Sequence, residues 1–448
     1  MSPLQQIVFP CFNWAIVPLT RYSNNWQKYP MRCRESYATD PNKDMRLDVE
    51  EKQMSTNTRS GPLEDLTIID CTMAYAGPYG TALLADMGAN VIKVEPPAGD
   101  NFRQLAPFPE DASRVGVESP GADYGAAFAS VNRNKRSISL DLKDPGDREI
   151  LLQLCERADA IVENMRAGVM DELGVGYEVI AARNPKIVYG TVRGYGDPRT
   201  GESPYADWPC LDVVGQSVGG LVEATGDLFG LAIADIFPGT LMATGLLAAV
   251  MQSRRTGKGE FFDVAMYDAV QALIKSNIAA YSVTGKQAKP GRKGLVPFGL
   301  FPTSDGRIAI AAPVERHWAY LCEAMGRPEL INDDRTRSNP RRAKNVVFTE
   351  AAITEWTQTK TKQEVVIAIG GEVPCGPANT IPEVLADPHT HARDMIQTFD
   401  FPGGQHKGLS TGSPIKFMSG NTDLYQRPPK HGEHGDEILA EFGIEPKG

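Results

Sequence analysis

Residues 66–95 read LTIIDCTMAYAGPYGTALLADMGANVIKVE, and this stretch decides the fold. The runs LTIIDC (66–71) and NVIKVE (90–95) are rich in β-branched apolar residues, which is typical of strands buried on both faces. TALLADMG, between them, has the composition of a helix and follows the short loop TMAYAGPYG. A strand, a helix and a second strand in this order predict a right-handed βαβ unit with parallel strands.

Strands and helices continue to alternate downstream. Candidate strands are SISLDL (137–142), the short apolar run DAIVEN and KIVYGTV (186–192), and DREILLQLCERA (147–158) is predicted to be a helix. FGLAIADIFPGTLMATGLLAAVMQSRRTGKG (229–259) contains a long helix that is expected to begin near Pro238, and a further strand and helix follow it. The alternation predicts an α/β fold, a Rossmann-like parallel sheet with helices on both faces.

Changes in composition divide the chain into four parts. Residues 1–62 have no periodicity and are expected to be an extension, either disordered or a targeting segment. Residues 63–283 form the predicted large Rossmann-like domain, and residues 284–390 comprise a Gly-, Pro- and Lys-rich linker and a smaller α+β domain. Residues 391–448 form a C-terminal segment that is expected to return to the large domain.

Composition excludes some classes of partner. The net charge is −10, and a negative field does not favour nucleic acid or an anionic membrane. The sequence contains no run of about 18 apolar residues, so no transmembrane helix is predicted. The seven cysteines have no CxxC spacing, so neither a zinc site nor a disulfide framework is indicated. We therefore expect a cytoplasmic protein, or a mitochondrial matrix protein if the extension is a transit peptide.

The first loop speaks against a dinucleotide cofactor. AGPYG stands where such a protein carries G-x-G-x-x-G, and the motif is absent. Gly77 is expected to make the turn, and Pro78 to occupy the first position of the helix.

Histidine usage directs attention to carboxylates. All six histidines lie at or beyond position 317, so no imidazole in the α/β part can act as a base or a metal ligand. Asp235 stands in the apolar segment LAIADIFPG, close to the expected helix N-terminus, where the helix dipole should keep it ionised. An ionised, poorly solvated carboxylate is a competent nucleophile. The alternative is a helix cap, which spacing alone favours because caps are far more frequent.

Several collinear segments resemble class III CoA-transferases, the family of carnitine CoA-transferase and formyl-CoA transferase. They include the opening stretch, VNRNKRSISLDLKDPGDREI, ADAIVENMRAG, LAIADIFPGTLMATGLLAAV, FGLFPTSDGRIAIAA, EVPCGPANTIPEVLADP and GEHGDEILAEFG. The resemblance covers about residues 64–443. It implies a large Rossmann-like domain with a smaller domain, and interlocked homodimers.

The resemblance also implies a covalent mechanism on Asp235, which matches the family's nucleophile. An acyl-CoA, such as succinyl-CoA, would give an aspartyl-CoA thioester through a mixed anhydride, and a small carboxylic acid, expected to be a dicarboxylate, would then take the CoA. One thioester is exchanged for another, so no ATP, metal or permanently bound cofactor is expected; CoA and acyl-CoA are substrates.

The family's CoA-binding positions can be carried over by the motifs that match. They correspond to Tyr75, Ala76, Leu140, Lys143, Asn164, Met165 and Arg166. We add Asp212 as a candidate for CoA binding; its alternative roles are to orient the site or to hydrogen-bond a loop. ENMRAG replaces the family's usual ENFRPG, and Pro96 and Glu172 stand where relatives often carry arginine, so the phosphate contacts are not fixed by the resemblance.

Two further positions bear on the substrate. Leu211 occupies the place of the histidine base of related racemases and of a tyrosine in formyl-CoA transferases, which favours transfer over racemisation and speaks against formyl or oxalate specificity. Arg292 and Lys293 in the linker are candidates to pair with the distal carboxylate of a dicarboxylic acid, with a solvated basic loop as the alternative. An acyl-CoA isomerase or racemase and a non-catalytic CoA-binding protein remain the alternative functions.

Overall fold

Six parallel strands form the central sheet of the computed structural model, which describes residues 59–109, 123–287, 290, 294–402, 406–418 and 424–445. The strands are β1 (Thr67–Cys71), β2 (Asn90–Glu95), β3 (Arg136–Ser139), β4 (Ala160–Glu163), β5 (Val188–Arg193) and β6 (Glu260–Ala265). Their order is β3-β2-β1-β4-β5-β6, and every neighbouring pair is parallel. This is the order of a doubly wound Rossmann-like sheet, so the predicted fold class is confirmed.

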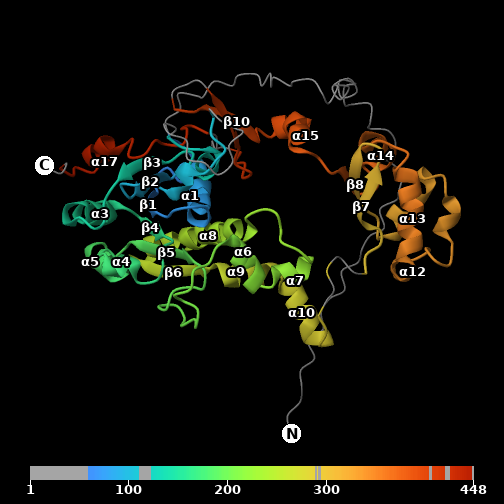
Figure 1. Ribbon diagram of the computed structural model, residues 1–448, viewed down its shortest axis with the longest axis horizontal. Coiled ribbons are helices and arrows are strands. Elements are labelled where there is room, and N and C mark those ends of the chain that lie inside the picture. The colour runs from blue at the N-terminus through green and yellow to red at the C-terminus, as the bar shows by residue number, and fades with distance from the viewer. Residues whose placement is uncertain are drawn as a thin grey trace, which may run out of the picture. The chain divides into compact units, whose positions relative to one another are not determined.

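Alternate residues of β1 face the two sides of the sheet. Ile68 belongs to a core with helices α1 (Ala76–Asp86) and α8 (Ile233–Thr256), and Ile69 to a second core with α3 (Pro145–Arg157) and α5 (Tyr177–Arg183). Figure 1 shows these helix pairs on opposite faces of the strands. Burial on both faces explains why the strands read as continuous apolar runs.

Two helices begin earlier than the sequence predicts. α8 starts at Ile233 rather than near Pro238, which lies in its second turn. α1 starts at Ala76, so Pro78 is its third residue rather than its first. Pro78 lies in the first turn of α1, where a proline is tolerated because the N–H groups there have no intrahelical partner. Pro238 lies inside α8, where a proline removes one backbone hydrogen bond. A proline therefore does not mark the first residue of a helix.

α8 is the one helix in the described part of the chain that is long and apolar enough to cross a membrane, by length and composition only. It packs on α1, β5 and β6, and Met242, Leu246 and Val250 are buried in the core that it shares with the sheet. Its apolar character is thus used in covering the sheet.

Shorter helices complete the sequence between β2 and β7. They are α2 (Ala126–Val131), α4 (Val169–Glu172), α6 (Asp212–Val218), α7 (Leu221–Thr225), α9 (Met266–Leu273) and α10 (Lys275–Thr284). A 3₁₀ turn spans Asn101–Gln104. α6 packs against α7, α8 and α9, so this group surrounds the N-terminal end of α8.

A second, antiparallel sheet lies further along the chain. It is formed by β7 (Phe298–Thr303), β8 (Gly306–Ala311) and β9 (Cys375–Pro377). Helices α11 (Glu315–Ala324), α12 (Asn339–Lys344), α13 (Val346–Thr357) and α14 (Lys362–Ile369) accompany it, with a 3₁₀ turn at Pro328–Ile331. Trp318 and Ile353 are buried in its own hydrophobic core.

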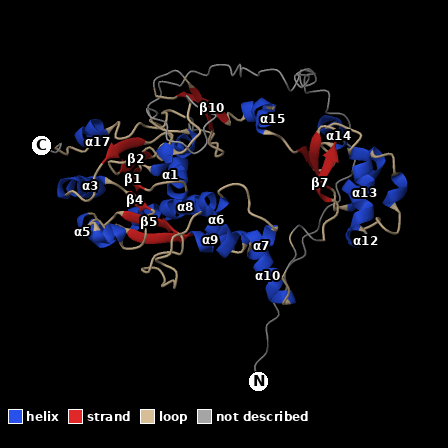
Figure 2. Ribbon diagram, viewed as in Figure 1, coloured by secondary structure: helices blue, strands red, loops and turns tan. Residues whose placement is uncertain are grey.

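The C-terminal part contains α15 (Ile381–Ala386), α16 (Pro388–Ala392), a hairpin of β10 (Ile396–Asp400) and β11 (Lys407–Thr411), and α17 (Gly435–Glu441). Figure 2 separates these helices and strands by colour. α17 packs on β3, and the backbone N–H of His434 donates to the carbonyl of Ser137 at 2.9 Å. The end of the chain therefore covers the edge strand of the parallel sheet.

Candidate active site

The carboxyl edge of the parallel sheet collects most of the predicted site residues. Tyr75 and Ala76 follow β1, Leu140 and Lys143 follow β3, and residues 164–166 follow β4. Strand order reverses between β1 and β4, and ligands of such sheets bind outside the carboxyl ends at this point. Loops far apart in sequence thus meet where the fold favours a ligand.

Two glycines bring the N-terminal ends of α1 and α8 together. A Cβ on Gly239 would lie 2.2 Å from the carbonyl oxygen of Ala76, and a Cβ on Gly80 would lie 2.4 Å from the carbonyl oxygen of Gly239. Only glycine permits this backbone approach. It places Tyr75 near Asp235: burial raises the pKa of Tyr75, and the Asp235 charge contributes to the rise.

Asp235 lies in the first turn of α8 and is not the helix cap. The cap position is Ala232, which has no capping side chain, and the backbone N–H of Asp235 donates to the Ala232 carbonyl at 3.1 Å. Within the described residues, no hydrogen bond or ion pair engages the Asp235 carboxylate. A carboxylate at a helix N-terminus without a partner of its own is free to react.

The protonation of Asp235 differs from the prediction. Burial, and then the nearby negative charge of Asp212, raise the pKa of Asp235 to about 7. The helix N-terminus therefore does not hold the pKa of this group in the ordinary range, and the carboxyl is only partly ionised at neutral pH, because a dipole contribution of about 0.3–1 kcal/mol is smaller than these two effects. Burial, Asp235 and Asp212 likewise raise the pKa of Cys210 to about 11, which places the thiol beside both carboxylates.

Asp212 supplies the cap that α8 lacks. It is the first residue of α6, and its Oδ1 accepts the backbone N–H of Ala234 at 2.8 Å. Its Oδ2 accepts a hydrogen bond from the buried side chain of Gln216 at 2.8 Å. Asp212 was predicted to bind CoA, with orientation of the site as an alternative role. Its contacts in the structure support the turn that carries Asp235. Leu211, directly before it, is 71% exposed.

Asn164 joins the loops that follow β1 and β4. Its amide oxygen accepts the backbone N–H of Met73 at 2.8 Å, and its amide nitrogen donates to the Met73 carbonyl at 2.7 Å. The neighbouring backbone N–H of Met165 donates to Glu163 at 2.7 Å. Asn164 thus holds the switch-point loops together.

The other predicted CoA-binding residues differ in exposure. Leu140 is 4% exposed and packs in the core, and its backbone N–H donates to the carbonyl of Glu95. Lys143 and Arg166 are exposed, and in the described ranges neither cationic group has an acidic partner. These two side chains are available for an anion. Arg292 and Lys293 lie outside the described residues.

A buried ionic network that the sequence reasoning missed supports the first loop. Asp70, at the end of β1, accepts hydrogen bonds from Lys135 at 3.0 Å and from Thr81 at 2.6 Å. Lys135 also donates to the carbonyl of Pro78 at 3.0 Å, which ties the network to α1. Burial alone would raise the pKa of Asp70, but Lys135 and Lys93 lower it to about 2.

The same network reaches a strained residue of the loop. Lys93 donates to the carbonyl of Thr72 at 2.8 Å and pairs with Asp100 at 2.9 Å. Asp100 in turn accepts the backbone N–H of Ala74, whose φ of 65° is rarely adopted by an alanine. Charged residues within strands that are buried on both faces were the sequence signal for this network.

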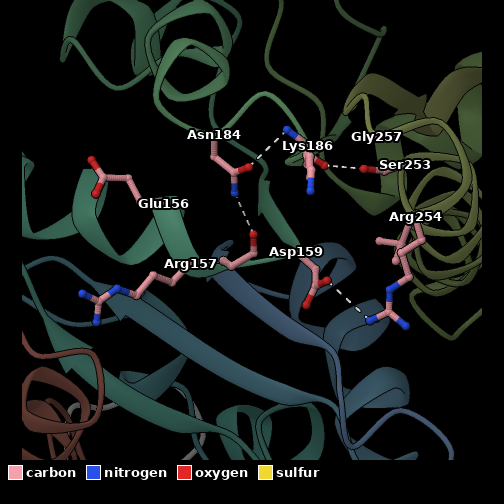
Figure 3. A pocket seen from close by; sticks show the side chains of 10 residues that line it. Glu156, Arg157, Asp159, Asn184, Lys186, Ser253, Arg254 and Gly257 are labelled. Carbon is pink, nitrogen blue, oxygen red and sulfur yellow. Dashed lines mark hydrogen bonds and ion pairs between the residues drawn. The ribbon is translucent and has the colours of Figure 1, made fainter.

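The described part of the chain also contains a cavity away from this edge. Its volume is about 400 Å³. It is lined by Glu156, Arg157, Ala158, Asp159, Asn184, Lys186, Val250, Ser253, Arg254 and Gly257. Figure 3 shows its side chains, and Arg254 pairs with Asp159 at 3.4 Å. Because these residues precede β4 and β5 or end α3 and α8, the cavity lies at the amino edge, opposite Asp235.

Within the described ranges, no group of three or more His, Cys, Asp or Glu side chains is placed to hold a metal ion.

Comparison with known sequences and structures agrees with this geometry. Residues 63–435 match the family described as CoA-transferase family III. The chain is 40% identical over 395 residues to a succinyl-CoA:mesaconate CoA-transferase of Haloarcula hispanica, which covers 86% of this chain and 97% of the relative. It is 32% identical over 391 residues to the human succinyl-CoA:glutarate CoA-transferase, which covers 85% and 86%.

A solved structure shares the fold. A CAIB/BAIF family protein from Brucella suis superposes with a TM-score of 0.74 at 31% identity, and the match covers 86% of this chain and all of that protein. The family match at residues 63–435 spans most of the described residues and includes the loops that follow β1, β3 and β4 at the carboxyl edge. The chain belongs to CoA-transferase family III and is a CoA-transferase.

Proposed function

We propose that this enzyme transfers CoA from succinyl-CoA, or a similar acyl-CoA, to a small dicarboxylate through a covalent intermediate on Asp235. The observation that carries the proposal is the place of Asp235: the first turn of α8, beside the α1 loop at the switch point, with no partner for its carboxylate among the described residues. The relatives named for mesaconate and glutarate support a dicarboxylate acceptor.

The first half of the reaction loads CoA onto the enzyme. The Asp235 carboxylate attacks the thioester carbonyl of the donor, the carbon–sulfur bond breaks, and a mixed anhydride and CoA thiolate form. The thiolate then attacks the aspartyl carbonyl of the anhydride and expels the donor acid as a carboxylate. The enzyme now carries an aspartyl-CoA thioester.

The second half reverses these steps with the acceptor. The acceptor carboxylate attacks the aspartyl thioester and releases CoA thiolate, which leaves a second mixed anhydride. The thiolate attacks the acceptor carbonyl, so the new acyl-CoA leaves and the Asp235 carboxylate is regenerated. The thioester energy is conserved over the full cycle, because one acyl-CoA thioester is consumed and one is formed.

The surrounding residues suit these steps. Ala76 and Gly77, in the first turn of α1, have backbone N–H groups without an intrahelical acceptor, and such groups stabilise negative charge. Lys143 and Arg166 are exposed and suited to the CoA phosphates. Leu211 provides no acid or base beside Asp235, which favours transfer over racemisation.

We also propose that Arg292 or Lys293 pairs with the distal carboxylate of the acceptor. The support is their position in a basic linker and the charge of a dicarboxylate. Replacing both by alanine should raise the Michaelis constants for dicarboxylates but not those for monocarboxylic acceptors. Unchanged Michaelis constants for dicarboxylates would remove these residues from the substrate site.

A homodimer is proposed as the assembled form. α10 has no buried residue, and Ile278, Tyr281 and Val283 of this helix are 50%, 55% and 86% exposed. An apolar helix surface of this kind is typical of a protein–protein interface. Sedimentation equilibrium tests the assembly: a mass of twice the chain is expected, and a monomer at micromolar concentration contradicts it.

Incubation with succinyl-CoA and a panel of carboxylic acids, read by mass spectrometry, tests the function. New acyl-CoA products are expected from dicarboxylates, with free succinate in equal amount. Asp235→Ala should abolish the exchange, whereas Asp436→Ala, an exposed aspartate in the first turn of α17, should not. Binding of CoA without exchange by any acid would indicate a non-catalytic protein, and conversion of one acyl-CoA without an acceptor would indicate an isomerase.

A further inference from the structure

Gln216 is a buried side chain of α6 that hydrogen-bonds to the segment leading into α8. Its amide nitrogen donates to Asp212 at 2.8 Å and to the backbone carbonyls of Phe229 and Leu231 at 3.1 and 3.3 Å. Its amide oxygen accepts the backbone N–H of Phe229 at 2.9 Å. The residue is 1% exposed, and both ends of its amide are engaged within the protein.

The segment that Gln216 holds has little support from burial. Leu228, Phe229 and Leu231 are 49%, 47% and 64% exposed. In the part of the chain that the structure describes, the hydrogen bonds that join Phe229 and Leu231 to residues outside their own turn all go to Gln216. An exposed segment with so few attachments has little local stability once they are removed.

Gln216 also acts on α8 through Asp212. It holds one oxygen of this carboxylate while the other accepts the backbone N–H of Ala234. The adjacent Gly215 lies against the same helix turn, since a Cβ there would be 3.0 Å from the Cβ of Ala234. Asp235 follows Ala234 directly, so two routes lead from Gln216 to the turn that carries Asp235.

We propose that Gln216 is a positioning residue for the transfer reaction: it fixes the first turn of α8, and with it Asp235, in the orientation that attacks the donor thioester. This role rests on the proposed function of Asp235. A displacement of about 1 Å at a reacting group can cost on the order of 100-fold in rate. The loss is therefore expected in the chemical step and not in the binding of the donor.

The test is the half-reaction with succinyl-CoA and no acceptor, on the full-length protein, followed by rapid quenching. The amplitude of aspartyl-CoA formation counts the competent sites, and its rate constant reports how well Asp235 is placed. Gln216→Met keeps the chain length but removes all four hydrogen bonds, whereas Gln216→Glu keeps the shape and the acceptor for Phe229. Gln252→Ala, at the exposed far end of α8, is the matched control.

Both Gln216 variants are expected to lower the rate constant by about 10- to 100-fold, with the amplitude and the donor Michaelis constant within about threefold of wild type. A purely structural role would instead lower the amplitude and leave the rate constant of each remaining site unchanged. A rate constant within about twofold of wild type in either folded variant overturns the proposal, and so does failure of both variants to fold.

Asp235→Ala separates this inference from the function on which it rests. If Asp235→Ala still forms the CoA adduct, the proposed function fails and the positioning role falls with it. If the adduct disappears in Asp235→Ala but forms at the normal rate in Gln216→Met, only the positioning role is lost.

Discussion

The nucleophile proposed here has a pKa close to the pH at which it would work. Burial and the Asp212 charge raise the pKa of Asp235 to about 7. The proposed attack needs the carboxylate, and a more basic carboxylate is the stronger nucleophile once it is ionised. The raised pKa therefore limits the ionised fraction at neutral pH and increases the reactivity of that fraction.

The rate of the donor half-reaction should accordingly fall on acidification through about pH 7, because Asp235 becomes protonated. A pH–rate profile with saturating succinyl-CoA measures this midpoint. Asp212→Asn removes the like charge, so its acid limb should move to lower pH. A wild-type midpoint near 4, the ordinary range of an aspartate, would contradict the environment described here.

The same shift has a consequence for stability. The folded-state pKa of Asp235 lies above the unfolded value, so ionisation destabilises the fold progressively between about pH 4 and pH 7. Asp235→Asn should therefore raise the unfolding free energy at pH 8, on the order of 1 kcal/mol, and change it little at pH 4. Urea unfolding at both pH values measures the difference. An equal effect at the two pH values would rule out ionisation as the cause.

At the residue scale, the sequence was informative about the identity of candidate groups and not about their surroundings. The absence of histidine from the first 316 residues removed the competing imidazoles, and the resemblance of the collinear segments then favoured Asp235 as a nucleophile over a helix cap. Its raised pKa, by contrast, depends on burial and on Asp212, 23 positions away. Gln216 could not be found because three of its four hydrogen bonds go to backbone groups, which have no sequence signature.

At the scale of helices, the contact of α1 with α8 positions the reacting residues. Gly239→Ala would place a Cβ 2.2 Å from the carbonyl oxygen of Ala76, so the helices must separate. We expect a loss of about 1–3 kcal/mol in unfolding free energy, with a lower rate of adduct formation. Gly201→Ala, where a Cβ meets nothing within 4 Å, is the control for both measurements. Normal adduct formation in Gly239→Ala would show that the close approach is not needed.

The buried network under the first loop is a second element-scale feature. Lys135 and Asp70 are both fully buried, and Lys135→Met leaves the Asp70 carboxylate without its closest cation. A loss of about 3–5 kcal/mol is expected on denaturant unfolding at pH 7. The double variant Asp70→Asn, Lys135→Met removes the unpaired charge and should recover part of that loss. A double variant less stable than Lys135→Met would contradict an ionic origin of the effect.

Element types were predictable where periodicity was strong. β1 and β2 lie within the predicted runs, and α3 covers most of its predicted run but starts two residues earlier, at Pro145; in each case the apolar pattern matches one structural period. The start of α8 was not predicted correctly, because Pro238 was interpreted as the first helical residue. The capping group is supplied by Asp212 of another helix, and no local pattern reveals a cap of that kind.

For the whole molecule, the parallel sheet explains why the candidate residues meet. The carboxyl ends of β1, β3 and β4 and the N-termini of α1 and α8 share one edge, and the family match extends over all of them. Strand order was not predictable from strand composition, because parallel strands buried on both faces resemble one another. The sheet does not determine which acid is the acceptor; the loops at its edge do.

Trapping the covalent intermediate tests the central claim most directly. The protein is incubated with succinyl-CoA alone, treated with hydroxylamine and digested, and the peptides are mapped by mass spectrometry. An aspartyl-CoA thioester predicts a hydroxamate on the peptide that contains Asp235, absent without succinyl-CoA and absent in Asp235→Ala. A hydroxamate on another carboxylate, or full CoA transfer by Asp235→Ala, would contradict the account.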